Sequence, residues 1–165
     1  MSTPRTDIGS AISVLLGCAS DVVATGAPKL VVAGGASDDA TERQGYTIDR
    51  YVSGSLAKSA KIVTVVLANV ADGETLALAH EYEDSADAST FNTAVAIEAS
   101  TTKITGATAT GVTGLTVADE HELDLSSLER YFRINVTPDF SAGSTDTCLF
   151  ATVVVLGGFD LTPVS

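Results

Sequence analysis

The sequence predicts an all-β protein, either a β-sandwich or a jelly-roll-like barrel with few short helical turns. Its apolar segments are short and rich in β-branched residues, and several alternate apolar with polar side chains, as strands with one buried face do. Segments rich in Gly, Ser, Thr and Asp separate them at short intervals. Helix signals are few, so the strands do not alternate with helices as an α/β fold requires.

The N-terminal part is expected to differ from the rest. Residues 1–17 are predicted to form an N-terminal arm or a short helix, because 8–16 carries a helical stripe of apolar residues. Residues 18–165 are predicted to form a single β domain, as the length favours. Within it a strand is expected around 30–32, followed by an exposed charged loop over 36–44.

The clearest short-range pattern lies in the middle of the chain. Residues 46–56 have strand composition, and 60–70 is a strongly apolar strand. An Asp72-Gly73 turn then leads into a returning strand over 75–83, which predicts a hairpin. One face of the returning strand carries Leu76, Leu78, His80 and Tyr82.

The next stretch is less regular. Residues 91–97 are expected to form a short strand, and 100–114, which is rich in Thr, Gly and Ala, suits short strands with loops between them. Residues 113–117 are predicted to be extended. The acidic residues 118–124 are expected in a loop, and 124–128 resembles a capped helical turn.

Residues 128–156 hold the most hydrophobic part of the chain. The first arm alternates, with Phe132, Ile134 and Val136 on one face. Pro138 cannot donate to a ladder, so this strand should stop there or continue only as an edge. The second arm, 148–156, is apolar on both faces, as a strand covered on both sides would be. The turn-rich residues between the arms predict a second hairpin with a longish loop.

Composition excludes several classes of function. The net charge is −12 and the Lys and Arg residues are scattered, so nucleic-acid binding and binding to an anionic membrane are not expected. Small side chains dominate the 45% hydrophobic content and aromatics are only 5%, which favours a homo-oligomer over a thin-cored monomer. No signal peptide or membrane-length apolar run is visible, which predicts synthesis in the cytoplasm.

The sequence offers no recognisable catalytic, cofactor or metal motif, so we expect no enzyme and no cofactor. Cys18 and Cys148 each lie in an apolar run and are expected to be buried thiols. His80 is expected to be a satisfied core or boundary histidine, and no Cys or His is spaced to complete a zinc site with it. His121 stands among Asp119, Glu120, Glu122 and Asp124, and this segment is expected to be a solvated loop rather than a Ca²⁺ site.

The C-terminal third carries a resemblance. An arginine–aromatic–arginine strand runs into Thr-Pro-Asp-Phe-Ser-Ala, then Ser-Thr-Asp-Thr, then an apolar strand ending in Leu-Gly-Gly-Phe-Asp-Leu-Thr-Pro, over residues 130–163. This resembles small virion proteins of tailed bacteriophages, and residues 75–91 are similar to the preceding segment of such proteins. Together these stretches cover about half of the chain.

The resemblance implies a non-enzymatic virion protein, most similar to the decoration or cement proteins on the outside of HK97-type capsids. It implies the major capsid protein as partner, a homotrimer, and a location on the outer capsid surface after synthesis in the host cytoplasm. Contacts are expected at Pro4, Arg5, Arg130, Arg133 and Phe159. A tail tube or tail-tip component is the alternative within the virion, and a carbohydrate-binding adhesin β-sandwich is the alternative outside it.

Overall fold

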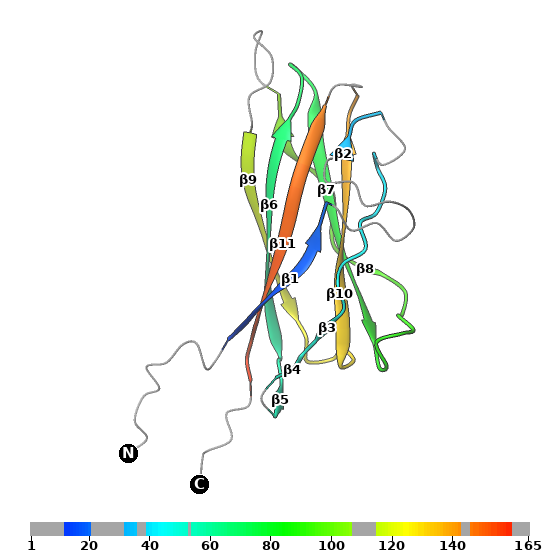
Figure 1. Cartoon of the computed structure of the whole chain (residues 1–165), viewed down its shortest axis with the longest axis vertical. Coiled ribbons are helices and arrows are strands. Elements are labelled where there is room, and N and C mark those ends of the chain that lie inside the picture. Colours follow the sequence, from blue (N-terminus) through cyan, green and yellow to red (C-terminus); the bar gives the residue numbers. More distant parts are fainter. Residues whose placement is uncertain are drawn as a thin grey trace, which may run out of the picture.

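The structure, a computed structural model, describes residues 12–20, 32–35, 39–52, 54–106, 115–142 and 146–159. These residues form two facing antiparallel sheets (Figure 1). Sheet A has the order β1 (Ser13–Ala19), β11 (Thr147–Gly157), β6 (Ser59–Asn69) and β9 (Leu115–Asp124), with β2 (Val32–Ala33) also paired to β11. Sheet B has the order β3 (Ile48–Asp49), β10 (Tyr131–Phe140), β7 (Thr75–Ser85) and β8 (Val95–Thr105). A small ribbon pairs β4 (Tyr51–Val52) with β5 (Ser55–Leu56).

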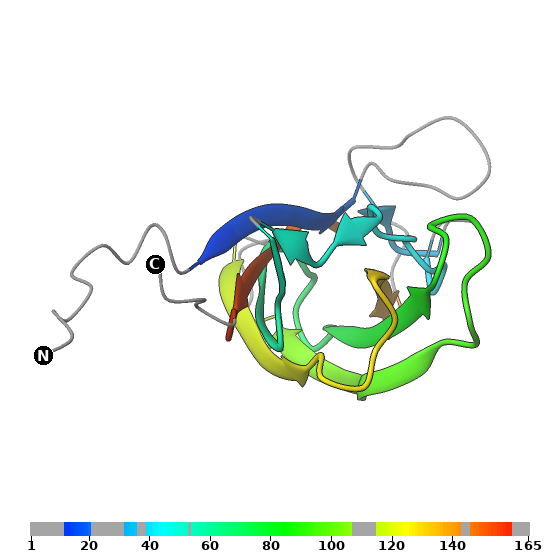
Figure 2. The same cartoon turned by 90° about the horizontal axis from the view of Figure 1, so that it is seen from below.

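The all-β prediction is confirmed. Turned to look along the strands, the two sheets curve around one shared interior (Figure 2). The described residues contain no helix, and hence none long and apolar enough to cross a membrane.

The core lies between the sheets, where strand alternation predicted it. Phe132, Ile134 and Val136 of β10 are fully buried, as are Leu76 and Leu78 of β7. Each such side chain contributes about 1.5–3 kcal/mol when it is fully removed from water. The two cysteines are free and buried, as expected.

Both predicted hairpins are wrong, because each pair of consecutive strands is divided between the two sheets. The strand β6 pairs with β11 and β9 in sheet A, whereas β7 pairs with β10 and β8 in sheet B. The same holds for β10 and β11. The Asp72-Gly73 turn does form, with Gly73 at a positive φ of 78° and Glu74 N donating to Ala71 O at 3.1 Å. It connects strands that face one another across the core instead of strands that share a ladder.

Pro138 behaves as the sequence predicts for an edge. It lies within β10 opposite Leu78 of β7, so the strand does not stop there. On its other side β3 pairs only with Tyr131 and Phe132. Near Pro138 the neighbour is instead an irregular segment, in which Arg43 forms a bridge with Val136 and Ala40 N donates to Pro138 O at 3.0 Å, a bond that does not need the missing N–H.

The N-terminal prediction needs correction where the structure describes it. Ser13–Ala19 is a strand on β11, not a helix, and the expected boundary between residues 17 and 18 falls inside it. A ladder with β11, interrupted only by a register shift between Leu16 and Cys18, outweighs a weak helical pattern. A Cβ on Gly17 would lie 2.6 Å from Val154 Cγ2, so glycine lets the two strands approach here. Residues 1–11 lie outside the described part.

Two local predictions near the end of β9 also change. Residues 118–124 belong to strand β9 and are not a loop. The expected helical turn is a single tight turn, in which Leu128 N donates to Leu125 O at 3.1 Å. Asp124 Oδ1 accepts from Ser126 N at 2.8 Å, which is the capping role that the sequence predicted for this aspartate.

Candidate functional site

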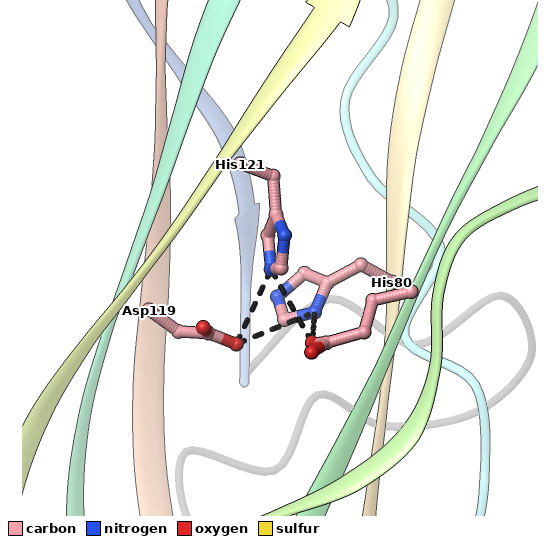
Figure 3. A group of neighbouring side chains, drawn as sticks. His80, Asp119 and His121 are labelled. Carbon is pink, nitrogen blue, oxygen red and sulfur yellow. Dashed lines mark ion pairs between the residues drawn. The ribbon is translucent and has the colours of Figure 1, made fainter.

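Charged and imidazole side chains from both sheets meet between the edge strands β8 and β9. We call this group the inter-sheet cluster, and it consists of His80 from β7, Glu98 and Lys103 from β8, and Asp119 and His121 from β9. Figure 3 shows His80 approaching from one side and Asp119 and His121 from the other. All five side chains are mostly or fully buried.

Strand register brings these residues together. In sheet A, Asp119 of β9 lies opposite Thr64 of β6. In sheet B, His80 of β7 lies opposite Glu98 of β8. The two pairs face each other across the core, because Thr64 Oγ1 lies 2.9 Å from His80 Nε2.

Four ligand-type atoms of the cluster converge, and all lie within 4.8 Å of one another. His80 Nδ1 lies 3.8 Å from both Glu98 Oε2 and Asp119 Oδ2. His121 Nε2 lies 3.5 Å from Glu98 Oε2 and 3.3 Å from Asp119 Oδ2. The two separations of 3.8 Å are too long for hydrogen bonds, and within the described residues none of the four buried atoms has a hydrogen-bond partner of good geometry, although the Lys103 ammonium lies 2.7 and 2.9 Å from the two carboxylate oxygens.

Lys103 supplies the cluster's permanent positive charge. Its Nζ donates to Glu98 Oε1 at 2.8 Å and to Asp119 Oδ1 at 3.1 Å, and it is also 2.7 and 2.9 Å from their other oxygens. Burial opposes its charge, but the bonds to the two carboxylates outweigh burial and raise the pKa of Lys103. Burial would likewise raise the pKa of Asp119, yet Lys103 and the histidines hold it below its usual value. Both groups are therefore charged at neutral pH.

His80 is held in one orientation by a hydroxyl pair in the core. Its Nε2 is 2.9 Å from Thr64 Oγ1, which is 2.8 Å from Thr152 Oγ1. Burial, together with neighbouring His121, lowers the pKa of His80 to about 4, so the ring is neutral at neutral pH. The prediction of a core histidine is confirmed for its burial, but its second nitrogen, Nδ1, points into the cluster without a hydrogen bond.

The cluster does not resemble an accessible hydrolase site. Thr64, His80 and Asp119 are arranged like the nucleophile, base and acid of a catalytic triad. Thr64 and His80 are fully buried, so a substrate has no access to the hydroxyl. Burial also raises the pKa of the Cys18 thiol to about 12, which leaves it a poor nucleophile.

The acidic segment of β9 is divided between the two faces of its strand. Asp119 points inward, whereas Glu120 and Glu122 point outward and pair with Lys61 of β6 at 3.1 and 3.8 Å. A strand places successive side chains on opposite faces, so these carboxylates do not surround one Ca²⁺.

The outer face of sheet A is a second notable surface. We call it the apolar face, and its exposed members are Val14, Leu16, Val65, Leu67 and Leu149, with exposed fractions of 37–59%. Register makes it continuous, since Leu67 lies opposite Leu149 and Leu16 lies opposite Val153. The prediction that β11 is covered on both sides is therefore wrong at Leu149, which is 37% exposed, and among the described residues no further layer packs on its outer side.

The predicted contact residues are scattered. Arg130 precedes β10, is 49% exposed, and forms a bidentate ion pair with Asp49. Arg133 pairs with Glu83, and its guanidinium lies 3.9 Å from the centre of the Phe91 ring. Phe159 follows β11 of the other sheet and is partly buried against the core. Pro4 and Arg5 lie outside the described residues.

Comparison with known proteins adds little. No family model matches the chain, and no curated protein matches it. Among solved structures, the chain is similar to the T13 particle of infectious bursal disease virus at 10% identity and a TM-score of 0.48, over 88% of this chain and 31% of that one. The VP2 subviral particle of the same virus is similar at 12% identity and a TM-score of 0.48, over 95% of this chain and 34% of that one. Dimeric latent PorU from Porphyromonas gingivalis is similar at 10% identity and a TM-score of 0.44, over 93% of this chain and 14% of that one.

The chain thus spans about a third of the length of the viral chains it matches. At these identities and TM-scores we draw nothing from the likeness about function.

Proposed function

We propose that this chain is a structural subunit of a virus particle, that its copies associate through the apolar face, and that in a tailed phage it decorates the outer surface of the capsid. The observation that supports it best is the apolar face itself. Monomeric soluble proteins rarely leave a contiguous group of large aliphatic side chains in water, and such surfaces usually mark contacts.

The size of the effect favours assembly over a tight isolated pair. Five side chains that are each roughly half exposed would contribute about 1 kcal/mol apiece on complete burial. Association costs about 4–15 kcal/mol in lost freedom of motion, so one such contact yields modest affinity. A subunit that makes several contacts at once on a lattice binds more tightly than one contact allows, because the first contact raises the effective concentration for the others.

Charge supports the same proposal. The chain carries a net charge of −12, so copies repel one another over most of their surfaces. On the outer face of sheet A the charged side chains described are Lys61 of β6 and Glu120, Glu122 and Asp124 of β9, which leaves the surroundings of Val65, Leu67 and Leu149 uncharged. Contacts are thus directed to this face. The proposed oligomer is a trimer, and the proposed contacts with the major capsid protein are Pro4, Arg5, Arg130, Arg133 and Phe159.

The association is tested with two valines of equal exposure. Val65 lies on the apolar face and Val95 starts β8 in the other sheet, and each is 46% exposed. Light scattering at about 100 µM, without dilution on a column, should show an oligomer for the wild type and for Val95→Glu, and a monomer for Val65→Glu. A monomeric wild type at about 100 µM, a concentration at which modest contacts are occupied, would overturn the self-association, as would identical masses for the two variants.

Particle composition tests the location separately. Quantitative mass spectrometry of purified virions should find the chain in hundreds of copies if it decorates a capsid. A handful of copies would move the assignment to a tail component, and complete absence would overturn the virion role.

A further inference from the structure

We infer that the inter-sheet cluster is a binding site for one divalent transition-metal ion of the Zn²⁺ type, coordinated by His80 Nδ1, Glu98 Oε2, Asp119 Oδ2 and His121 Nε2. This goes beyond the proposed function and does not depend on it. The ion would link β7 and β8 of sheet B to β9 of sheet A.

The spacing of the four atoms fits tetrahedral coordination. Zinc binds imidazole nitrogen and carboxylate oxygen at about 2.1 Å, and tetrahedral angles then separate ligand atoms by about 3.4 Å. The four nitrogen-to-oxygen separations in the cluster are 3.8, 3.8, 3.5 and 3.3 Å. The nitrogen-to-nitrogen and oxygen-to-oxygen separations are at most 4.8 Å, about 1.4 Å above the tetrahedral value, so the side chains must move inward to close around an ion.

An unpartnered buried nitrogen points to a ligand independently of the spacing. His80 is fully buried, and its Nδ1 has no hydrogen-bond partner among the described residues. Leaving such an atom unsatisfied costs about 1–3 kcal/mol. A metal ion would accept its lone pair, and the ring N–H on Nε2 would then donate to Thr64 Oγ1. Metal-binding histidines are generally oriented by such a second hydrogen bond.

The donor set selects the class of metal. Two imidazoles and two carboxylates suit zinc and neighbouring first-row ions, whereas Ca²⁺ and Mg²⁺ prefer oxygen alone. Four protein ligands fill a tetrahedron and leave no open position, which is the pattern of a structural site and not a catalytic one.

Lys103 is the feature that argues against a metal, because its ammonium already neutralises one of the two carboxylate charges. Its Nζ lies 2.7 Å from Glu98 Oε2 and 2.9 Å from Asp119 Oδ2, the same two oxygens that face the histidines. A metal ion must therefore displace the ammonium toward Oε1 and Oδ1, to which Lys103 also donates. With Lys103 present the two carboxylates and the ammonium sum to −1, and a divalent ion brings the cluster to +1. The lysine orients the ligands and lowers the affinity by repulsion, so its removal should strengthen binding.

The test uses the untagged full chain after removal of metals with a chelator. We expect one Zn²⁺ per chain by calorimetry, and a rise in melting temperature of about 5 °C or more with zinc at a hundred times its Kd. Co²⁺ should give the intense visible absorption of a tetrahedral site, and Ca²⁺ and Mg²⁺ should not bind. A wild-type chain that binds neither Zn²⁺ nor Co²⁺ stoichiometrically, or that binds Co²⁺ with the weak octahedral spectrum, would overturn the inference.

Neighbouring residues of one strand provide the matched variants. Asp119→Asn should weaken zinc binding at least about 100-fold, beyond the 10–100-fold typical of an altered outer-shell partner. Glu120→Gln, which changes the next carboxylate on the outward face, should bind as the wild type does. Equal affinities for these two variants would overturn the site.

Lys103→Met separates a metal site from a simple ion-pair cluster. A metal site predicts tighter zinc binding in this variant, and an ion-pair cluster predicts none. If Asp119→Asn does not fold, His121→Gln on the same edge strand carries the same expectation.

Discussion

The side chain of Arg50 links two connecting segments at one end of the sandwich by hydrogen bonds to their backbone carbonyl oxygens. It lies between β3 and β4 and is 6% exposed. Its guanidinium donates to the carbonyl oxygens of Ala57, Leu125 and Leu128, the first at 3.2 Å. These three acceptors belong to the segment after the β4–β5 ribbon and to the tight turn after β9. One side chain thus fixes two connections that are far apart in sequence.

Replacing Arg50 with Met should cost about 3–5 kcal/mol. Hydrogen bonds from a charged donor contribute about 1.5–3 kcal/mol each but are not additive when they share one side chain. Removal of one partner of a buried charged contact typically costs 3–5 kcal/mol, because the groups left behind are unpaired. At about 2–4 °C per kcal/mol for a domain of this size, the melting temperature should fall by roughly 6–20 °C.

The measurement is denaturant and thermal unfolding of Arg50→Met beside Arg130→Met. Arg130 is the matched control, since its bidentate pair with Asp49 is half exposed and should contribute far less than the buried contacts of Arg50. Arg50→Lys keeps the charge without the planar fork and should fall between the wild type and Arg50→Met. If Arg50→Met unfolds within about 1 kcal/mol of the wild type, the bridging role of Arg50 is wrong.

Three further predictions follow from the surroundings of single residues. Because burial raises the pKa of the Cys18 thiol to about 12, Ellman's reagent at pH 8 should modify it far more slowly in buffer than in urea, and equal rates would contradict its burial. Burial, with the nearby Glu83, raises the pKa of Glu42. Ionisation of Glu42 therefore lowers the stability of the folded chain as the pH rises through the pKa that Glu42 has in the unfolded chain. Glu42→Gln should gain up to about 1 kcal/mol of stability at pH 7 and nothing at pH 3, and an equal gain at both pH values would contradict this cause. A Cβ on Gly106 would overlap the carbonyl oxygen of Ala71, so Gly106→Ala should lose about 3 kcal/mol in a denaturant midpoint assay, and an unchanged midpoint would contradict the close approach.

Which face of each strand is buried could be predicted from the sequence, because alternation is a local property. Phe132, Ile134 and Val136 were expected inside and are buried, and His80 was placed on the inner face of its strand. Which strand lies beside which could not. Two apolar-faced strands joined by a turn can pair in one sheet or face one another across a core, and both arrangements produce the same alternation. The Asp72-Gly73 turn forms in either case, so its signal does not distinguish them.

The apolar content of β11 was predictable, but what covers it was not. Apolar residues on both faces of a strand indicate that both faces avoid water, and a partner from another chain satisfies that as well as a layer of the same chain does. Leu149 at 37% exposure and Val65 at 46% are therefore as informative about assembly as the buried inner face is about folding.

The inter-sheet cluster shows why spacing rules could not reveal the candidate site. Zinc motifs are recognised when pairs of ligands are close in sequence, whereas these ligands come from three strands in two sheets. Only Asp119 and His121, two residues apart on one strand face, left a local signal. The rest depends on register, which sets Asp119 opposite Thr64 and His80 opposite Glu98. A slip of one residue in either ladder would turn a ligand outward, so the site is only as well defined as the pairing that positions it. A metal that requires all four ligands would in turn favour this register over its neighbours.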